Sequence, residues 1–266
     1  MKKFNKILIA VAIAGAAAMP FSANAAMVNS LLVGGENQFQ DTDVERVLRN
    51  GQVVTSGEFQ VGDVIQAILR FTDVNSVVVS DNPGFGFPYQ LLAYSEVEVT
   101  SITGVVDVGG GINQGTLNFG ATGNLGADVV ATFYERTANV PGFSISVDPA
   151  TAVANVTGLT QIATAGFGEA DDFWRATSLL DLGLAANQLQ GSPQQASGQF
   201  GLSFLSGSLP FIKNGILSGD DGNYHDVVGS ASAYKLDTGA NAGWLVSSNT
   251  EVRFNVPEPS SIHFWV

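Results

Sequence analysis

Apolar and polar residues alternate with a period of two along most of the chain. In residues 64–71 the apolar positions that would share one face are Ile65, Ala67, Leu69 and Phe71. Residues 91–100 repeat the pattern, and there Glu96 and Glu98 fall on the polar side. Further alternating segments are found at 129–136, 143–147, 198–204, 230–236 and 250–256. Because successive side chains of a strand point to opposite faces, this pattern predicts β-strands that each bury one face.

Clusters of Gly, Asn, Asp, Ser and Pro separate these segments, for example at 80–88 and 107–115. Such residues favour turns, so the strands are expected to be joined by turns and loops. No Pro-rich or Ser-rich linker divides residues 26–256, and all-β domains of this length commonly stay single. The sequence therefore predicts one all-β domain over residues 26–256, built as an antiparallel β-sandwich or jelly roll.

One or two short helices are expected beside the strands. Asp148 can accept from the first free amides of a helix, Pro149 suits the first helical position, and Gly158 can take the left-handed cap conformation. Residues 178–190 follow neither period and are interpreted as a helix or a loop. The acidic stretch from Asp41 to Glu45 is interpreted as a charged loop.

The first 25 residues have the pattern of a secretory signal peptide. Three lysines precede an apolar run from Ile7 to Met19, and Ala23 and Ala25 supply the small residues that signal peptidase needs. The alternative is an N-terminal membrane anchor, but the run is shorter than the roughly 20 apolar residues that a span requires. We expect export by the Sec machinery and cleavage by signal peptidase between Ala25 and Ala26.

Charge and composition exclude several functions. The chain has a formal net charge of −13, and loss of three lysines with the signal peptide would make it −16. Nucleic acids and anionic membrane surfaces repel such a chain, because binding to them depends on Lys and Arg contacts to phosphate. The chain has no cysteine, so it has no disulfide, no thiolate metal site and no cysteine nucleophile.

One loop has the composition of a calcium site. Residues 218–226 gather four oxygen-bearing side chains beside His225: Asp220, Asp221, Asn223 and Asp226. Calcium prefers such oxygen ligands, although the loop lacks the ligand spacing and terminal glutamate of an EF-hand. The alternative, a solvated turn between two strands, is favoured because turns use the same residues. Calcium is the one cofactor that the sequence suggests.

Acidic residues also precede a pair of aromatic residues. Glu169, Asp171 and Asp172 stand just before Phe173 and Trp174. A glycosidase or a sugar-binding face uses carboxylates beside an aromatic platform, and Trp174, Tyr224 and Trp244 are the candidate stacking rings. The alternative, acids in a turn at the start of a strand with the aromatics packing into the core, is favoured.

No convincing catalytic set is present. Histidine occurs only at His225 and His263, so a Ser-His-Asp triad would have to be built around His225 alone. No G-x-S-x-G motif occurs, and the glycine runs lack the lysine and following helix of a phosphate-binding loop. We therefore expect no catalytic residues and no enzymatic activity.

The end of the chain carries a proline-containing box. Val256, Pro257, Glu258 and Pro259 follow directly on the alternating segment 250–256, and two serines come next. The prolines end the strand and hold the chain extended, because proline lacks an amide proton and has a fixed φ. This V-P-E-P-S-S stretch resembles the PEP-CTERM sorting signal of exported proteins from Gram-negative bacteria that make extracellular polysaccharide.

The resemblance implies a destination. In that family exosortase, a membrane-embedded transpeptidase-like protein, handles a box that is followed by a transmembrane helix and an arginine-rich end. Pro257, Glu258 and Pro259 would be the box here, but residues 262–266 are too short to span a bilayer and contain no arginine. We expect residues 257–266 to be a sorting tail without its anchor, and the mature chain to be released without a stable membrane span.

Two functions remain as hypotheses. The first is a non-enzymatic structural protein of the cell surface or extracellular matrix, associated with exopolysaccharide or biofilm, with exosortase and extracellular polysaccharide as candidate partners. The second is a carbohydrate-binding module or a carbohydrate-active hydrolase. Exposure of Trp174, Tyr224 and Trp244 on one face would favour the second hypothesis.

We predict that the exported chain begins at Ala26. N-terminal sequencing of protein recovered from the medium should yield Ala-Met-Val as the first three residues. A sequence starting at Met1, or inside the apolar run, would show that cleavage does not occur there.

Overall fold

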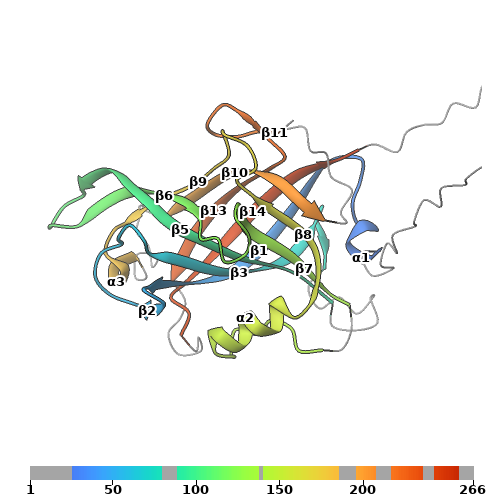
Figure 1. Ribbon diagram of the computed structural model, residues 1–266, viewed down its shortest axis with the longest axis horizontal. Helices are drawn as coiled ribbons and strands as arrows, with labels where there is room; N and C mark the ends of the chain where they lie inside the picture. Colours follow the sequence, from blue (N-terminus) through green and yellow to red (C-terminus); the bar gives the residue numbers. More distant parts are fainter. Residues whose placement is uncertain are drawn as a thin grey trace, which may run out of the picture.

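The computed structural model describes residues 26–79, 89–137, 140–185, 196–207, 217–235 and 243–257, and these form fourteen strands and three helices (Figure 1). The helices are α1 (Ala26–Asn29), α2 (Pro149–Thr157) and α3 (Leu182–Ala185). The strands are β1 (Gly35–Arg49), β2 (Gln52–Val54), β3 (Val64–Val74), β4 (Val77–Val78), β5 (Gln90–Asp107), β6 (Asn113–Ala121), β7 (Val129–Arg136), β8 (Thr160–Gly166), β9 (Phe173–Leu179), β10 (Ser197–Gly207), β11 (Leu217–Ser218), β12 (Tyr224–His225), β13 (Val227–Lys235) and β14 (Val246–Val256).

Eight strands close into an antiparallel barrel in the order β3, β1, β14, β13, β10, β8, β7, β5 and back to β3. The ladder between β3 and β5 closes it, running from Val64 opposite Glu98 to Phe71 opposite Leu91. The predicted β-sandwich or jelly roll is therefore wrong, because one sheet returns to its own first strand. A sandwich and a barrel both bury one face of each strand, so period-two alternation cannot separate them.

Each of two long strands, β5 and β10, pairs with two different strands along one of its sides. Residues 90–95 of β5 pair with β7, whereas residues 97–107 pair with β6. In β10, residues 197–201 pair with β9 and residues 203–207 pair with β8. Because β6 also pairs with β9, the barrel is closed by β7 and β8 at one end and by β6 and β9 at the other.

Aromatic side chains fill the end that β7 and β8 close. The buried rings there are Phe39, Phe71, Phe133, Phe204 and Phe254. The ring centroid of Phe39 lies 5.2 Å from that of Phe71 and 4.9 Å from that of Phe254, both edge-on, which is a favourable geometry for aromatic pairs. Near this end Val28 is buried, and its backbone N–H donates to Glu135 Oε1 at 2.8 Å. This half of the interior is a packed core.

The predicted core face of β3 is confirmed. Ala67, Leu69 and Phe71 are buried inside the barrel, and Ile65 packs against this core while partly buried. Ile68, on the opposite face, is buried as well. The reason is that α2 covers part of the outside of the barrel and adds a second, smaller core there.

The helix predicted between Asp148 and Gly158 is α2. Asp148 caps it by accepting a hydrogen bond from the N–H of Thr151 at 3.0 Å, and Pro149 is its first residue. Gly158 caps the other end with a φ of −81°, so the predicted left-handed conformation is wrong. Of the ambiguous stretch 178–190, residues 178 and 179 end β9 and residues 182–185 form α3, and residues 186–190 lie outside the described residues.

Both terminal signals fall largely outside the described residues. Ala25 with the rest of the signal segment, and Glu258 and Pro259 of the box, are among the residues not described. Val256 is the last residue of β14 and is buried. Within the described ranges, none of the helices has the length and apolar character needed to span a bilayer.

We predict that Phe71→Ala lowers the free energy of unfolding by about 3–5 kcal/mol, because it leaves a cavity among packed rings. The control is Val61→Ala, whose side chain is 62% exposed and whose loss should cost less than about 0.5 kcal/mol. Urea denaturation of both variants measures the difference. Equal costs would contradict a barrel core at Phe71.

Candidate functional site

A cavity of about 130 Å³ lies in the barrel lumen beside the aromatic core, toward the end that β6 and β9 close. Small side chains line much of it: Ala67, Ala93, Ala131, Ala165, Ala176, Ala231 and Gly198. These positions point inward, as the phenylalanines do, but they leave space unfilled. An engineered apolar cavity of about 150 Å³ binds benzene, so this lumen is large enough for a small molecule.

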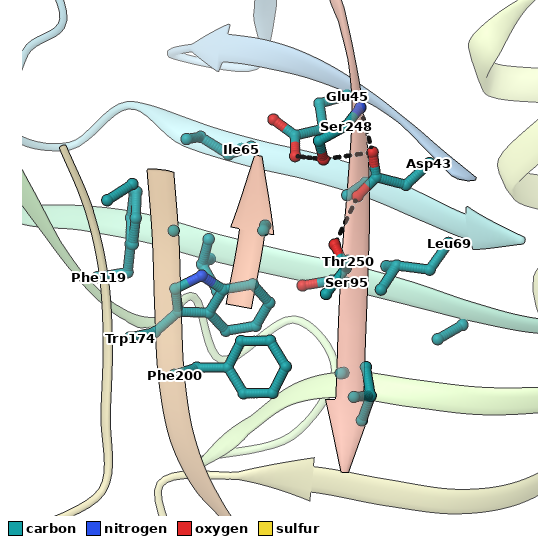
Figure 2. A pocket seen from close by; sticks show the side chains of 18 of the residues that line it. Asp43, Glu45, Ile65, Leu69, Ser95, Phe119, Trp174, Phe200, Ser248 and Thr250 are labelled. Atoms are coloured by element: carbon teal, nitrogen blue, oxygen red, sulfur yellow. Dashed lines mark hydrogen bonds between the residues drawn. The ribbon is translucent and has the colours of Figure 1, made fainter. Parts of the chain in front are cut away.

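One wall of the cavity is aromatic. Trp174 of β9 and Phe200 of β10 face the lumen with ring centroids 5.0 Å apart (Figure 2). Gly229 of β13 makes room for this arrangement, because a Cβ at that position would lie 2.1 Å from Cζ of Phe200. The sequence therefore places a flat apolar surface on this side of the lumen.

The opposite wall carries two carboxyl groups. Asp43 and Glu45 are successive inward residues of β1. At this end the eight strands around the lumen are β3, β1, β14, β13, β10, β9, β6 and β5. In that ring β1 lies directly opposite β9, four strands away in either direction. Ser248 of β14 stands opposite Asp43. It donates to that carboxylate from its backbone N–H at 2.6 Å and also from its hydroxyl, and Thr250 donates its hydroxyl to the second oxygen at 3.3 Å (Figure 2). These donors favour an ionised Asp43.

The two carboxyl groups share one hydroxyl. Oγ of Ser248 contacts Asp43 and also lies 3.0 Å from Oε1 of Glu45. A serine hydroxyl has a single proton, so when it donates to Asp43 the proton of the second hydrogen bond must come from Glu45. Burial, reinforced by the charge of Asp43, raises the pKa of Glu45 to about 8. Burial also raises the pKa of Asp43, against the Ser248 and Thr250 hydrogen bonds. The pair therefore holds one proton near neutral pH.

A third acid, Asp41, continues the same row. Its side chain is 4% exposed, and its Oδ1 accepts from the N–H of Thr250 at 2.6 Å. Its Oδ2 has no hydrogen-bond partner among the described residues. Burial, and then the charge of Asp43, raises the pKa of Asp41 well above its ordinary value. The described residues that line the cavity include no Lys, Arg or His. No cationic side chain of the lining therefore compensates the negative charge of these acids.

The predicted calcium loop does not bring its four candidate ligands together, although the side-chain amide of Asn223 donates to Asp221 Oδ2 at 2.8 Å. Asp221 Oδ1 accepts from the N–H of Asn223 at 3.1 Å, whereas Asp226 Oδ2 accepts from the N–H of Phe204 at 3.0 Å. Asp220 is exposed. Across the described ranges, no three His, Cys, Asp or Glu residues are grouped so as to hold a metal ion. Calcium binding at this loop stays a prediction.

His225 lies between two carboxylates. Its side chain is buried, with Nδ1 3.3 Å from Oδ1 of Asp172 and Nε2 3.2 Å from Oδ1 of Asp221. Ser203 donates its hydroxyl to the other oxygen of Asp172 at 2.8 Å. The histidine thus contacts carboxylates through both nitrogens, and the serine contacts an aspartate, which is not the order of a Ser-His-Asp triad. The N–H of Glu169 donates to Asp172 within the turn before β9.

The three candidate stacking rings do not share a face. Trp174 faces the barrel lumen. Trp244 is buried in the outer core near α2, where the guanidinium of Arg46 lies 5.9 Å from its ring. Tyr224 is 61% exposed on β12. Of these rings, only Trp174 belongs to the lumen.

The lumen acids correct the interpretation of residues 41–45 as a charged loop, because that stretch lies in the middle of β1. The pattern contained the signal: Asp41, Asp43 and Glu45 occupy alternate positions between two apolar residues on the same face, Phe39 and Val47. An acid on an apolar strand face is a candidate functional residue, since its burial is costly.

Comparison with known proteins adds little. No protein-family model matches the chain, and no curated protein does. Among solved structures, that of a DUF1329 family protein from Desulfovibrio piger aligns with 90% of this chain and 91% of its own, at 10% identity and a TM-score of 0.12. A similarity this weak carries no argument about fold or function.

We predict that Glu45→Gln flattens the pH dependence of stability. The pKa of Glu45 rises from 4.5 to about 8 on folding, so the stability that its proton contributes is complete below about pH 4.5 and is lost as the pH rises through about 8. Glutamine cannot ionise, so the variant should be more stable than the native chain at pH 8, by on the order of 1–3 kcal/mol.

Urea denaturation at pH 5, 6.5 and 8 measures this effect. Some slope should remain, because the pKa values of Asp41 and Asp43 are raised too. The matched control is Glu36→Gln, whose side chain is 50% exposed on the same strand, and it should follow the native profile. A native profile for Glu45→Gln would contradict a protonated Glu45.

Proposed function

We propose that this chain is a non-enzymatic binding protein that holds one small, largely apolar molecule in the lumen of its barrel. The observation that carries the proposal is the cavity of about 130 Å³, with alanine and aromatic walls, a few serine and threonine side chains, and its two carboxyl groups on β1. Ligand sites are concave, mostly apolar and equipped with a few placed polar groups. Eight-stranded barrels are just wide enough to hold one small ligand.

The energetic cost of the cavity supports a functional role. Unfilled core volume costs about 24 cal/mol per Å³, so this cavity would lower stability by about 3 kcal/mol. Larger apolar residues in place of Ala67 or Ala176 would fill the space. Local features that reduce stability without a structural gain are typical of functional sites. Asp43 and Glu45 add a second cost of the same kind, since carboxyl groups lose their hydration when buried.

The proposal is compatible with a destination outside the cell. A released barrel could carry or sequester a small molecule in the extracellular matrix, and export and sorting at the box stay predictions. The carbohydrate hypothesis gains no support from the aromatic residues, because Trp174, Tyr224 and Trp244 occupy three separate places. A polysaccharide chain is also too large for a cavity of this volume.

We predict that toluene, a neutral probe of suitable size, raises the melting temperature of the native chain and binds with one-to-one stoichiometry. Binding to the folded state alone stabilises it by mass action. Ala176→Leu places a larger side chain in the cavity and should abolish the effect. Calorimetric scanning with and without toluene, together with isothermal titration, provides the measurement.

The control for this experiment is Ala154→Leu, the same substitution at an exposed position of α2. It should bind toluene as the native chain does. Absence of binding to the native chain, or equal binding by Ala176→Leu, would contradict a ligand site in the lumen.

A further inference from the structure

We propose that the lumen selects a molecule with a positively charged amine on a small apolar body, with the amine lying against Asp43 and Glu45. This inference rests on the proposed function, because it specifies the ligand of the same cavity.

The distribution of side chains around the cavity requires a ligand with two different ends. Asp43 and Glu45 are the ionisable groups among the described lining residues, and both belong to β1. Trp174 and Phe200 lie across the lumen from them, on β9 and β10 (Figure 2). A ligand that fills the cavity therefore places one end against carboxyl groups and the other against aromatic rings.

The sign of the charge decides between possible polar ends. An anionic ligand would be repelled by Asp43, and the described lining includes no cation to attract it. An alcohol can donate one hydrogen bond but leaves the negative charge uncompensated. An ammonium group carries three donors and the opposite charge, and charge-assisted hydrogen bonds are about twice as strong as neutral ones. The amine is the group that satisfies both requirements.

Unused acceptors in the acid row support the same conclusion. Among the described residues, Glu45 Oε1 contacts Ser248, and Oε2 of Glu45 accepts no hydrogen bond. Asp41 Oδ2 is buried in the same row without a partner. Buried acceptors are normally satisfied, so Asp41 is an exception that needs an explanation, whereas Glu45 is only partly buried and lines the cavity itself. A donor supplied by a ligand explains why Glu45 keeps a free oxygen at the cavity wall.

A different buried acid shows how this fold compensates a carboxylate for structural purposes. Asp63 is fully buried, and the guanidinium of Arg49 donates to both of its oxygens, at 2.7 and 2.8 Å. The N–H of Gln60 adds a third hydrogen bond at 2.8 Å. The lumen acids have no such internal cation. Glu96 and Glu135 are also buried with neutral donors only, but Asp43 and Glu45 line a cavity that a ligand cation can enter.

Four probes of one shape test the inference: toluene, benzyl alcohol, benzylamine and benzoate. Isothermal titration of the mature chain at pH 7 should give benzylamine an affinity about 10- to 100-fold higher than that of benzyl alcohol, with benzoate the weakest. The double variant Asp43→Asn, Glu45→Gln should lose the preference for benzylamine over benzyl alcohol. Glu36→Gln, an acid-to-amide change on the outer surface, should keep it.

The outcomes separate the two proposals. If toluene does not bind the native chain, the proposed function fails. If toluene binds and benzylamine binds no tighter than benzyl alcohol, or if the double variant keeps the amine preference, the amine inference alone fails. A cooperative urea unfolding transition of the double variant shows that its barrel is intact. Should that variant not fold, Glu45→Gln on its own is expected to reduce the amine preference, and an unchanged preference would overturn the inference.

Discussion

Closure of the sheet through the ladder between β3 and β5 is the constraint on which the other features of the structure depend. A strand at a sheet edge leaves backbone donors and acceptors unpaired, and a closed barrel removes that edge for its eight strands. Closure also separates the inward face of every strand from bulk solvent. The size of the inward side chains then determines whether the lumen is filled or hollow.

The two ends of the barrel differ in how completely the inward side chains fill the lumen. Where β7 and β8 close it, five phenylalanine rings pack against one another in edge-on, tilted and stacked pairs and fill the interior. Toward the end that β6 and β9 close, several inward positions around the barrel carry alanine beside larger residues such as Phe119 and Trp174, and a cavity remains. The two ends can differ because β5 and β10 each pair with one strand at one end and with another strand at the other end. Each end therefore has its own pair of closing strands. One half of the interior thus stabilises the fold, and the other half can serve binding.

Burial of the acid row would be unfavourable without the strand pairing around it. The register of β1 with β14 places Ser248 opposite Asp43, so that hydroxyl and amide donors face the carboxylate. Those donors satisfy Asp43 but leave Glu45 to hold a proton and to keep one oxygen free. Charge is therefore confined to the lumen, where a cation can reach it. The same groups link the stability of the chain to pH.

Much of this fold could be predicted from the sequence, and the reasons for the failures are physical. The face of β3 that carries Leu69 and Phe71, and the helix capped by Asp148, follow from local periodicity and capping chemistry. Barrel closure depends on pairing between distant strands, which alternation does not encode. The composition of residues 41–45 favours a charged loop over a strand, because Asp and Glu are depleted in strands. The positions of Asp43 and Glu45 in phase with Phe39 and Val47 would have placed them inside.

The central claim is that the closed barrel has a hollow, ligand-accessible interior. A crystal structure of the mature chain under xenon pressure tests it directly, because xenon enters apolar cavities and is located by its anomalous scattering. We predict a xenon atom inside the barrel, in contact with Ala176 and Phe200. A lumen filled by side chains, or xenon bound only outside the barrel, would contradict the account.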